Sequence, residues 1–521
     1  MKSEKKQIRF NEILTMLYTI LMLCFFPLFY RNNYIDILRA KRDFFLAATG
    51  IFLLLWVLTV MILKWKKKPQ SCVGVQKNRQ NKGWYVWGII YLSGLAGGWL
   101  FSPYKRDCFW GLQGRYLGVL ALAMGVWISW ILARDLKRNK VLAGAAALSS
   151  GSIFVLQILD EWKIDLLGMK SNLVERQHPV FSSTIGNRNF NATFNCMMIG
   201  TAMAVFVLCR KTYSRILCGI WLILGFAAAF CCRSDSVFLG VGTVFLVFFW
   251  YVLKQKICWR DFMILATLFV AAAGMVAVFY SGLKKRAYEM EGAAGILLRP
   301  EILCAEIVGI LALLGLFFYM EKQTMTGEKQ KICRCLQRIY LRISGGVLLI
   351  LATCFYLANK NGAELAEESW LQLFRITKYW GGNRGYVWRR SLELFGEYSW
   401  FQKLFGCGAN CFSYWFQGAF GHEVSSVKNQ VFIDAHSEYL QMLMTTGIVG
   451  CIGYFGMIAA TLVNCIRNMK KRGKEQSLPG IVFLSAFLAQ GLLNNPQIAT
   501  TPLLFVWMGM IWGMSKYENK S

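Results

Sequence analysis

The stretch Asp434-Ala-His-Ser-Glu-Tyr-Leu-Gln-Met-Leu-Met-Thr-Thr-Gly447-Ile-Val-Gly450 leads from a long polar segment directly into an apolar run. It contains His436, one of only three histidines among 521 residues, and the residues after it are typical of a membrane-spanning helix. Because the imidazole titrates near neutral pH, its place at the border between a polar segment and a membrane helix makes it a candidate for chemistry.

The whole chain shares this apolar character. Hydrophobic residues make up 56% of the sequence, aromatic residues 15%, and the mean hydropathy is +0.41, which is too apolar for a soluble protein of this length. Apolar runs of about 18 to 22 residues recur from end to end, each long enough to cross a hydrocarbon core of roughly 30 Å. We therefore expect an all-α polytopic membrane protein with about fourteen transmembrane helices. Their approximate spans are 11–29, 44–63, 84–101, 116–133, 141–158, 191–209, 216–232, 236–253, 261–280, 302–320, 343–358, 438–462, 478–494 and 501–515.

The net charge of +30 follows the membrane topology. Lys and Arg concentrate in alternate short connections, at 64–68, 134–140, 210–211, 322–342 and 467–474. This distribution predicts that both termini lie in the cytoplasm and that the protein is a multi-pass protein of the cell membrane. The first run has no small-residue cleavage site before Tyr30, so we interpret it as a retained signal anchor. The basicity indicates contact with anionic membrane lipids and gives no evidence of nucleic-acid binding.

This orientation divides the chain into three parts, which are helices 1–11 with short loops at 1–358, a large extracytoplasmic loop at 359–437, and helices 12–14 with a cytoplasmic tail at 438–521. The large loop is rich in aromatic residues, among them Trp370, Tyr379, Trp380, Trp388, Trp400, Phe412 and Phe416. A segment with this composition is able to pack, so we expect it to be folded. Residues 385–395 have the pattern of an amphipathic helix.

His436 is the first candidate for a catalytic residue. A histidine at the start of a helix often has only a structural role, but Asp434 and Glu438 lie close enough in sequence to orient its ring or to change its pKa. The other two histidines, His178 and His422, fall in predicted outer loops without such neighbours, and we interpret them as structural.

Arginines in the predicted outer segments are the second set of candidates. Arg384 and Arg390 lie in the large loop, Arg233 lies in a tight turn between two apolar runs, and Arg188 follows an Asn-rich turn. Guanidinium groups stay charged at physiological pH and pair with phosphate oxygens, which suits a phospholipid-like or polyprenyl pyrophosphate ligand. The alternative is that these side chains only contact lipid headgroups.

The sequence lacks patterns that would indicate a metal or a nucleotide cofactor. The first outer segment has no closely spaced acidic pair, no outer segment gathers His, Cys and carboxylates, and no Walker or dinucleotide-binding fingerprint is present. We therefore expect neither a metal nor another cofactor. The chain has 17 cysteines, and the pair Cys407 and Cys411 is predicted to face outside. These two residues could either form a disulfide or remain as free thiols.

Four motifs in sequence order resemble the O-antigen ligase and polysaccharide polymerase family. They are Ser183-Thr-Ile-Gly-Asn-Arg-Asn-Phe190, with Arg188 where the family has proline; Cys232-Arg-Ser-Asp-Ser236, with Asp235 where it has glycine; Arg384-Gly-Tyr-Val-Trp388 followed by Leu404-Phe-Gly-Cys-Gly408, without the usual proline; and Ala435-His-Ser-Glu-Tyr-Leu440 followed by Thr446-Gly-Ile-Val-Gly450, with Ser437 where it has asparagine. The similarity covers residues 85–515.

The resemblance implies a GT-C-like membrane glycosyltransferase that needs no metal. It would act on undecaprenyl-pyrophosphate-linked oligosaccharide at the outer face of the cell membrane and transfer the glycan to a sugar, lipid or protein acceptor. In that interpretation His436 is the general base, Arg233 and Arg384 hold the pyrophosphate with help from Arg188 or Arg390, and Asp434 and Glu438 support His436. Polymerase and ligase activities both fit. A permease or a flippase for lipid-linked oligosaccharide is the alternative function.

Overall fold

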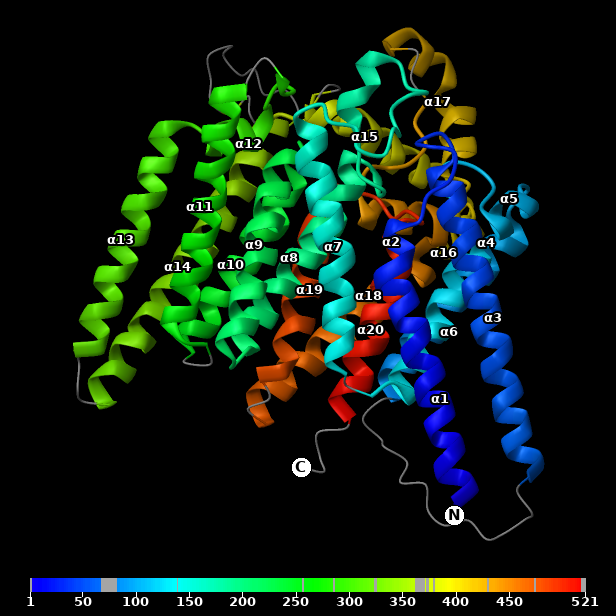
Figure 1. The fold of residues 1–521 in the computed structure, drawn as a ribbon. Coiled ribbons are helices and arrows are strands. Elements are labelled where there is room, and N and C mark those ends of the chain that lie inside the picture. The colour runs from blue at the N-terminus through cyan, green and yellow to red at the C-terminus, as the bar shows by residue number, and fades with distance from the viewer. Residues whose placement is uncertain are drawn as a thin grey trace.

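The computed structural model describes residues 2–66, 82–137, 139–254, 257–283, 286–322, 326–360, 371, 374–377, 380–428, 431–472 and 475–516, and it is 80% helical (Figure 1). The helices in chain order are α1 (Lys2–Ile20), η1 (Leu21–Phe25), α2 (Phe26–Leu28), α3 (Ile37–Lys66), α4 (Lys82–Phe101), α5 (Lys105–Trp110), α6 (Val119–Asp135), α7 (Lys140–Glu161), η3 (Glu175–Val180), α8 (Arg188–Leu208), α9 (Thr212–Cys231), α10 (Ser236–Leu253), α11 (Trp259–Leu283), α12 (Gly292–Leu297), α13 (Pro300–Lys322), α14 (Thr326–Asn359), α15 (Trp380–Glu397), α16 (Trp400–Phe405), α17 (Phe412–Lys428), α18 (Glu438–Arg472), η6 (Glu475–Ser477), α19 (Leu478–Gln490) and α20 (Thr501–Lys516). Strands β1 (Phe181–Ser182) and β2 (Gly186–Asn187) form a short antiparallel pair before α8.

Nine of the described helices are long and apolar enough to cross a membrane by length and composition. They contain the apolar parts of α1 to α2, α3, α7, α8, α9, α10, α11, α14 and α18. The other five predicted runs also form helices, namely α4, α6, α13, α19 and α20. The helical fold of a membrane protein is thus confirmed, while the number of fourteen crossings stays a prediction.

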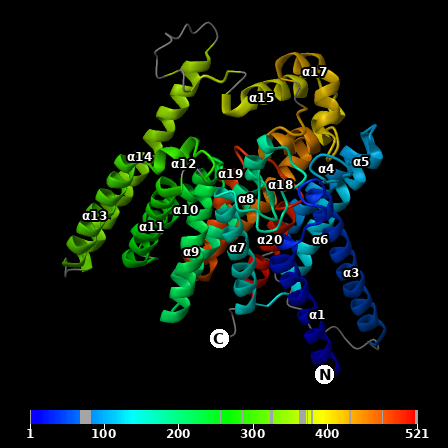
Figure 2. The same cartoon turned by 45° about the horizontal axis from the view of Figure 1, so that its top comes forward.

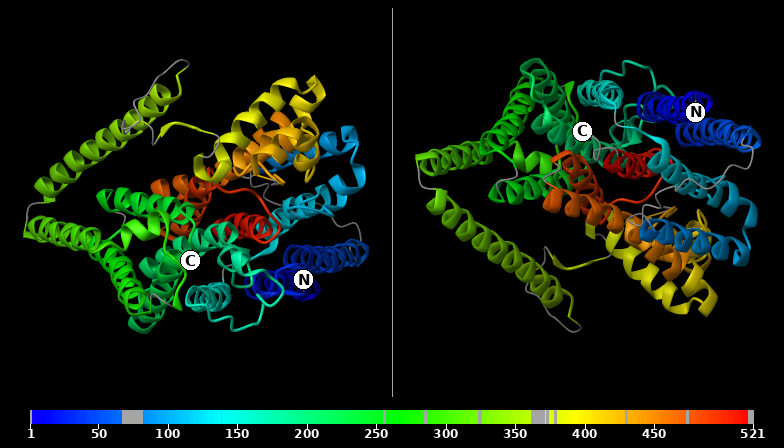
Figure 3. Two further views of the ribbon diagram at one scale, coloured as in Figure 1. Left: turned by 90° about the horizontal axis from the view of Figure 1, so that it is seen from above. Right: turned by 90° about the horizontal axis from the view of Figure 1, so that it is seen from below.

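The helices differ sharply in how deeply they are buried. In α8, 83% of the apolar window is buried inside the protein, whereas in α14 only 11% is. Seen from above and below, α13 and α14 form the outermost hairpin at one edge of the molecule (Figure 3). Most of the apolar window of α14 is therefore on the outside of the protein, where a membrane protein meets lipid.

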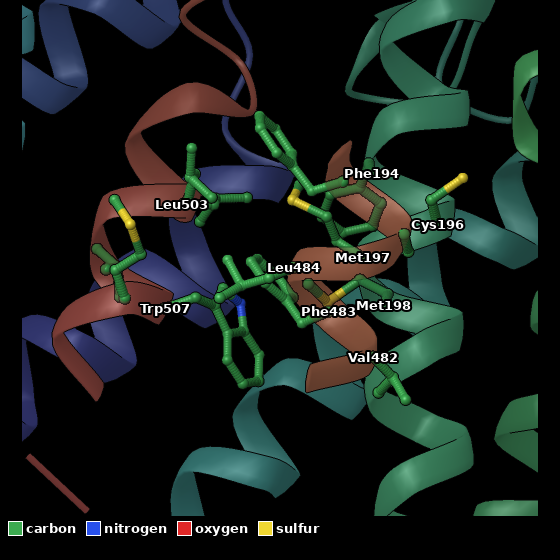
Figure 4. Close-up of a cluster of buried hydrophobic side chains, with 14 of the residues drawn as sticks. Phe194, Cys196, Met197, Met198, Val482, Phe483, Leu484, Leu503 and Trp507 are labelled. Atoms are coloured by element: carbon green, nitrogen blue, oxygen red, sulfur yellow. The ribbon is translucent and has the colours of Figure 1, made fainter. Parts of the chain in front are cut away.

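Helices α8, α19 and α20 form the centre of the apolar core. Phe194 and Met197 from α8 lie against Leu484 from α19, and Phe483 stacks on Trp507 from α20 with ring centroids 4.9 Å apart (Figure 4). These side chains are almost completely buried. Because other helices surround α19 and α20, their apolar surface is covered by protein although both are short.

Helix α18 changes direction at Gly447, which has φ 66° and ψ −173°. A Cβ atom there would lie 2.4 Å from the Leu404 carbonyl group, so only glycine permits this close approach of α16. The break also exposes two carbonyl groups of α18, which accept hydrogen bonds from the backbone N–H groups of Cys407 (2.9 Å) and Gly408 (3.1 Å). The break thereby fixes the large loop onto α18.

Below this break, α18 packs against α4 through small residues. A Cβ atom on Gly94 would lie 2.4 Å from the Gly450 Cα atom, one on Gly453 would lie 2.3 Å from the Tyr91 backbone nitrogen, and one on Gly456 would lie 2.5 Å from the Trp87 ring. Small residues of this kind let two membrane helices approach closely.

The described part of the segment predicted as a large loop folds into α15, α16 and α17, and Figure 2 shows α15 and α17 above the main helix bundle. The helix predicted at 385–395 is confirmed as the main part of α15. Near its start, α15 contains a left-handed turn at Gly381, Gly382 and Asn383, and the regular helix follows this turn. A separate apolar cluster joins α15, α17 and the start of α18, and it includes Val387, Phe412, Phe416 and Phe432. Trp370 and Tyr379 lie outside the described residues.

Candidate functional site

His436 lies in a tight turn immediately before α18. Its backbone is in the left-handed region, with φ 50°, and its N–H group donates to Asp434 Oδ1 at 2.8 Å. The ring atom Nδ1 lies 3.2 Å from the same carboxylate oxygen. A carboxylate beside Nδ1 favours a proton on that nitrogen and leaves Nε2 able to accept one. The turn therefore presents the imidazole in a form suited to a general base.

The second oxygen of the Asp434 carboxylate is bound by Arg115, from the connection between α5 and α6. Arg115 reaches Asp434 Oδ2 through Nε at 2.7 Å and Nη2 at 2.5 Å, and its guanidinium group lies over the ring of Phe190 at 4.9 Å. The carboxylate is fully buried, so this pairing offsets the cost of desolvating it. Sequence reasoning missed Arg115, since no motif links it to a residue more than three hundred positions away.

These contacts act on the pKa values of the pair. Burial alone would raise the pKa of Asp434, but Arg115 and His436 hold it below its ordinary value. The Asp434 carboxylate by itself would raise the pKa of His436, yet burial and the positive charges of Arg115 and Arg384 together lower it. A lowered pKa favours the neutral imidazole, which is the form that a general base requires.

Two further arginines are linked to this pair by charge, since Arg384 acts on His436 and Arg188 acts on Arg384. Arg384, at the start of the regular part of α15, is half-buried and donates from Nε to the Leu493 carbonyl group (3.1 Å) and from Nη1 to the Gly381 carbonyl group (2.6 Å). Burial lowers the pKa of Arg384 and the positive charge of Arg188 acts in the same direction, whereas Asp434 and Asp235 oppose it. Two guanidinium groups whose charges act on each other are suited to binding an anion.

Arg188 is the exposed member of this group. It is the first residue of α8, and it has no hydrogen bond or ion pair with any residue in the described part of the chain. The Asn187 side chain caps the helix by accepting from the Asn189 N–H group at 2.9 Å. We call Arg115, Arg188, Arg384, Asp434 and His436 the His436 cluster.

The loop between α19 and α20 connects the separate parts of this cluster. Its Gly491 carbonyl group accepts from the Glu438 N–H group (2.8 Å), and its Leu493 carbonyl group accepts from Arg384. The Ile498 N–H group donates to the Arg115 carbonyl group at 3.2 Å. One loop thus holds three site segments that are far apart in sequence, and sequence reasoning did not identify it.

Arg233, in contrast, is paired with other residues. Its Nε lies 3.1 Å from the buried Glu161 carboxylate, its Nη2 donates to the Pro179 carbonyl group at 2.6 Å, and its guanidinium group lies 4.6 Å from the Tyr288 ring centroid. Lys170 and Asp160 form a second buried ion pair of 2.9 Å next to it. We call Asp160, Glu161, Lys170, Arg233 and Tyr288 the Arg233 cluster. The described contacts of Arg233 do not include His436 or Arg384.

The remaining predicted residues differ in their surroundings. Arg390 pairs with Glu393 at 2.6 Å and lies over the Phe420 ring at 5.1 Å, on the side of α15 that faces α17. The Glu438 carboxylate accepts a hydrogen bond from the Tyr454 hydroxyl group at 2.6 Å. Of the two predicted supporting carboxylates, therefore, Asp434 contacts His436 and Glu438 is bound within the core.

The other residues considered for chemistry lie elsewhere. His178 is 3.1 Å from the Leu173 carbonyl group, and His422 is an exposed residue of α17. Cys407 and Cys411 are both free thiols. Within the described ranges, no group of three or more His, Cys, Asp or Glu residues has the arrangement of a metal site.

Fold and site together define a helical membrane protein with a histidine, a carboxylate and arginines at one face. Comparison of the chain with protein-family models gives no match, and comparison with curated proteins gives no significant match.

Proposed function

We propose that the protein is a membrane glycosyltransferase that moves a glycan from an undecaprenyl-pyrophosphate carrier to an acceptor hydroxyl group at the outer face of the cell membrane. The observation that carries this proposal is the His436 cluster, in which a histidine oriented by Asp434 lies within the electrostatic reach of Arg384, and Arg384 within that of Arg188. The order of the four sequence motifs supports the same function.

In this proposal the arginines act on the leaving group. As the bond between the anomeric carbon and the diphosphate oxygen breaks, the oxygen takes the electron pair and negative charge develops on the diphosphate. Arg188 and Arg384 stabilise this charge, and no metal ion is required for that purpose. Arg188 is free to turn toward a ligand because it has no partner among the described residues.

His436 acts on the nucleophile. Its Nε2 takes the proton of the acceptor hydroxyl group as the oxygen forms the new bond to the anomeric carbon. Asp434 keeps the proton on Nδ1 and stabilises the imidazolium that results, and Arg115 keeps Asp434 in place. Among the predicted pyrophosphate ligands, Arg384 and Arg188 fit this role better than Arg233, which is paired with Glu161, and Arg390, which is paired with Glu393.

The decisive experiment uses the purified full-length protein in lipid vesicles, supplied with lipid-linked oligosaccharide and no added metal. We expect the carrier diphosphate to be released together with a longer or transferred glycan, and His436→Ala to abolish both. His178→Ala is the matched control, since His178 lies outside the cluster.

The products also separate the alternatives. Growth of glycan chains on the carrier indicates a polymerase, and transfer to an added acceptor indicates a ligase. Movement of intact lipid-linked oligosaccharide across the membrane, with no new glycosidic bond, would favour a permease or flippase and overturn the proposal.

A further inference from the structure

A pocket of about 510 Å³ lies at the opposite end of the molecule from the His436 cluster, between α4, α18 and α20. It opens near the first residues of α4 and the last turns of α18 and α20, on the side where α1 begins and α20 ends (Figure 1). The positive charges of the sequence predict that this side is cytoplasmic. The pocket begins where the close glycine contact between α4 and α18 ends, at Gly456 and Trp87.

The polar groups on the pocket wall are able to donate hydrogen bonds, and the described lining residues include no Asp or Glu. Arg467 is exposed and has no hydrogen bond or ion pair with a described residue. Asn464 lies one turn before it, and its Nδ2 is buried without a partner. Trp84 is 1% exposed, and its Nε1 also lacks a partner. Unpaired buried donors are unfavourable, so an acceptor-rich anion held by Arg467 would satisfy groups that the protein leaves unsatisfied.

The rest of the wall is apolar and opens toward the lipid. Trp84 and Trp512 stack with ring centroids 5.1 Å apart, and Val463, which lines the pocket, is 41% exposed on α18. Arg467 lies in the last turn of the candidate span that ends at Lys470, which is the depth at which a headgroup meets the acyl region. A lipid whose phosphate binds Arg467 would therefore place its acyl chains along the apolar side wall of the pocket.

We propose that this pocket binds the headgroup phosphate of an anionic phospholipid from the cytoplasmic leaflet. The choice of an anionic lipid follows from the lining, because the ammonium group of a zwitterionic headgroup would find no carboxylate there. A phospholipid fits better than a free phosphate ion because its acyl chains can contact the apolar wall, whereas a small ion would leave that wall without a partner. The proposal does not depend on the function proposed above.

The test compares the full-length protein in vesicles of phosphatidylcholine with and without phosphatidylglycerol. The measurements are the melting temperature and the lipid that stays bound in native mass spectrometry. We expect phosphatidylglycerol to raise the melting temperature and to be retained, and Arg467→Gln to weaken retention about fivefold, the effect of one surface cation. Lys470→Gln is the matched control, since Lys470 is an exposed cation of the same helix that does not line the pocket.

A second variant keeps the test valid if Arg467→Gln does not fold. Val463→Trp fills the pocket from an exposed position, so we expect it to reduce retention without disturbing the core. Equal retention by the original protein and either pocket variant would overturn the proposal. So would an equal rise in melting temperature from inorganic phosphate in pure phosphatidylcholine, which would indicate a site for a free ion.

Discussion

The His436 cluster and the Arg233 cluster both contain arginines and carboxylates, but they differ in how completely their cations are paired. In the Arg233 cluster, Arg233 meets Glu161 and Lys170 meets Asp160, and all four side chains are largely buried. In the His436 cluster, the Asp434 carboxylate holds Arg115 and His436, while Arg188 has no partner among the described residues. The comparison indicates that protein carboxylates occupy the cations of the first cluster and that the second has charge available for a ligand.

The largest expected effect is on the reaction itself. His436→Ala removes the base, so the rate of glycan transfer should fall by about 10² to 10⁴, the usual contribution of a positioned base. The rate is measured from chain growth or transfer in vesicles. The melting temperature and membrane insertion should stay unchanged, as in His178→Ala. Normal transfer by the His436 variant would show that the base lies elsewhere.

The second prediction concerns the Arg233 cluster. Arg233→Gln leaves the buried Glu161 carboxylate without its cation, so the free energy of unfolding should fall by about 3 to 5 kcal/mol. Thermal or denaturant unfolding in detergent measures this loss. The double variant Arg233→Gln with Glu161→Gln should recover much of it, because no buried charge is then unpaired.

The Arg233 variant could instead keep its stability and lose affinity for the lipid-linked substrate. That result would contradict the assignment of Arg233 to a structural ion pair. Arg233 would then belong to the ligand site, as the sequence motif suggests.

The third prediction concerns Arg188, the cation without a partner among the described residues. Arg188→Gln should weaken binding of the lipid-linked substrate by about tenfold to a hundredfold, the value of a hydrogen bond to a charged group, with little change in stability. Substrate titration of the transfer rate measures the effect. Arg389→Gln is the control, since Arg389 is an exposed arginine that pairs with Glu393. Equal effects of the two variants would mean that the charge of Arg188 has no specific role.

The smallest effects are opposite shifts in pH dependence. The neutral imidazole is the active form, so the rate should rise with pH through the pKa of His436, which lies below its ordinary value. Arg115→Gln removes a positive charge that lowers this pKa, so the rise should move to higher pH. Asp434→Asn removes the charge that raises it, so the rise should move to lower pH. Shifts in the same direction would contradict the described arrangement.

The sequence alone determined the helical membrane fold, because apolar runs of membrane-spanning length are a local property of the chain. It also located His436 and Asp434, which are neighbours in sequence and meet in one turn. The amphipathic pattern of 385–395 is also a local property of the chain, and it predicted the main part of α15.

Only the tertiary structure decided which charges are paired. Arg115 reaches Asp434 from a distant segment, the loop after α19 holds Glu438 and Arg384, and Glu161 takes Arg233. Pairing depends on where the ends of separate helices meet, and helix packing fixes this through contacts such as those of Gly447 and Gly450. A pattern read along the chain identifies an arginine, but the three-dimensional position of the nearest carboxylate determines whether that arginine is free to bind a ligand.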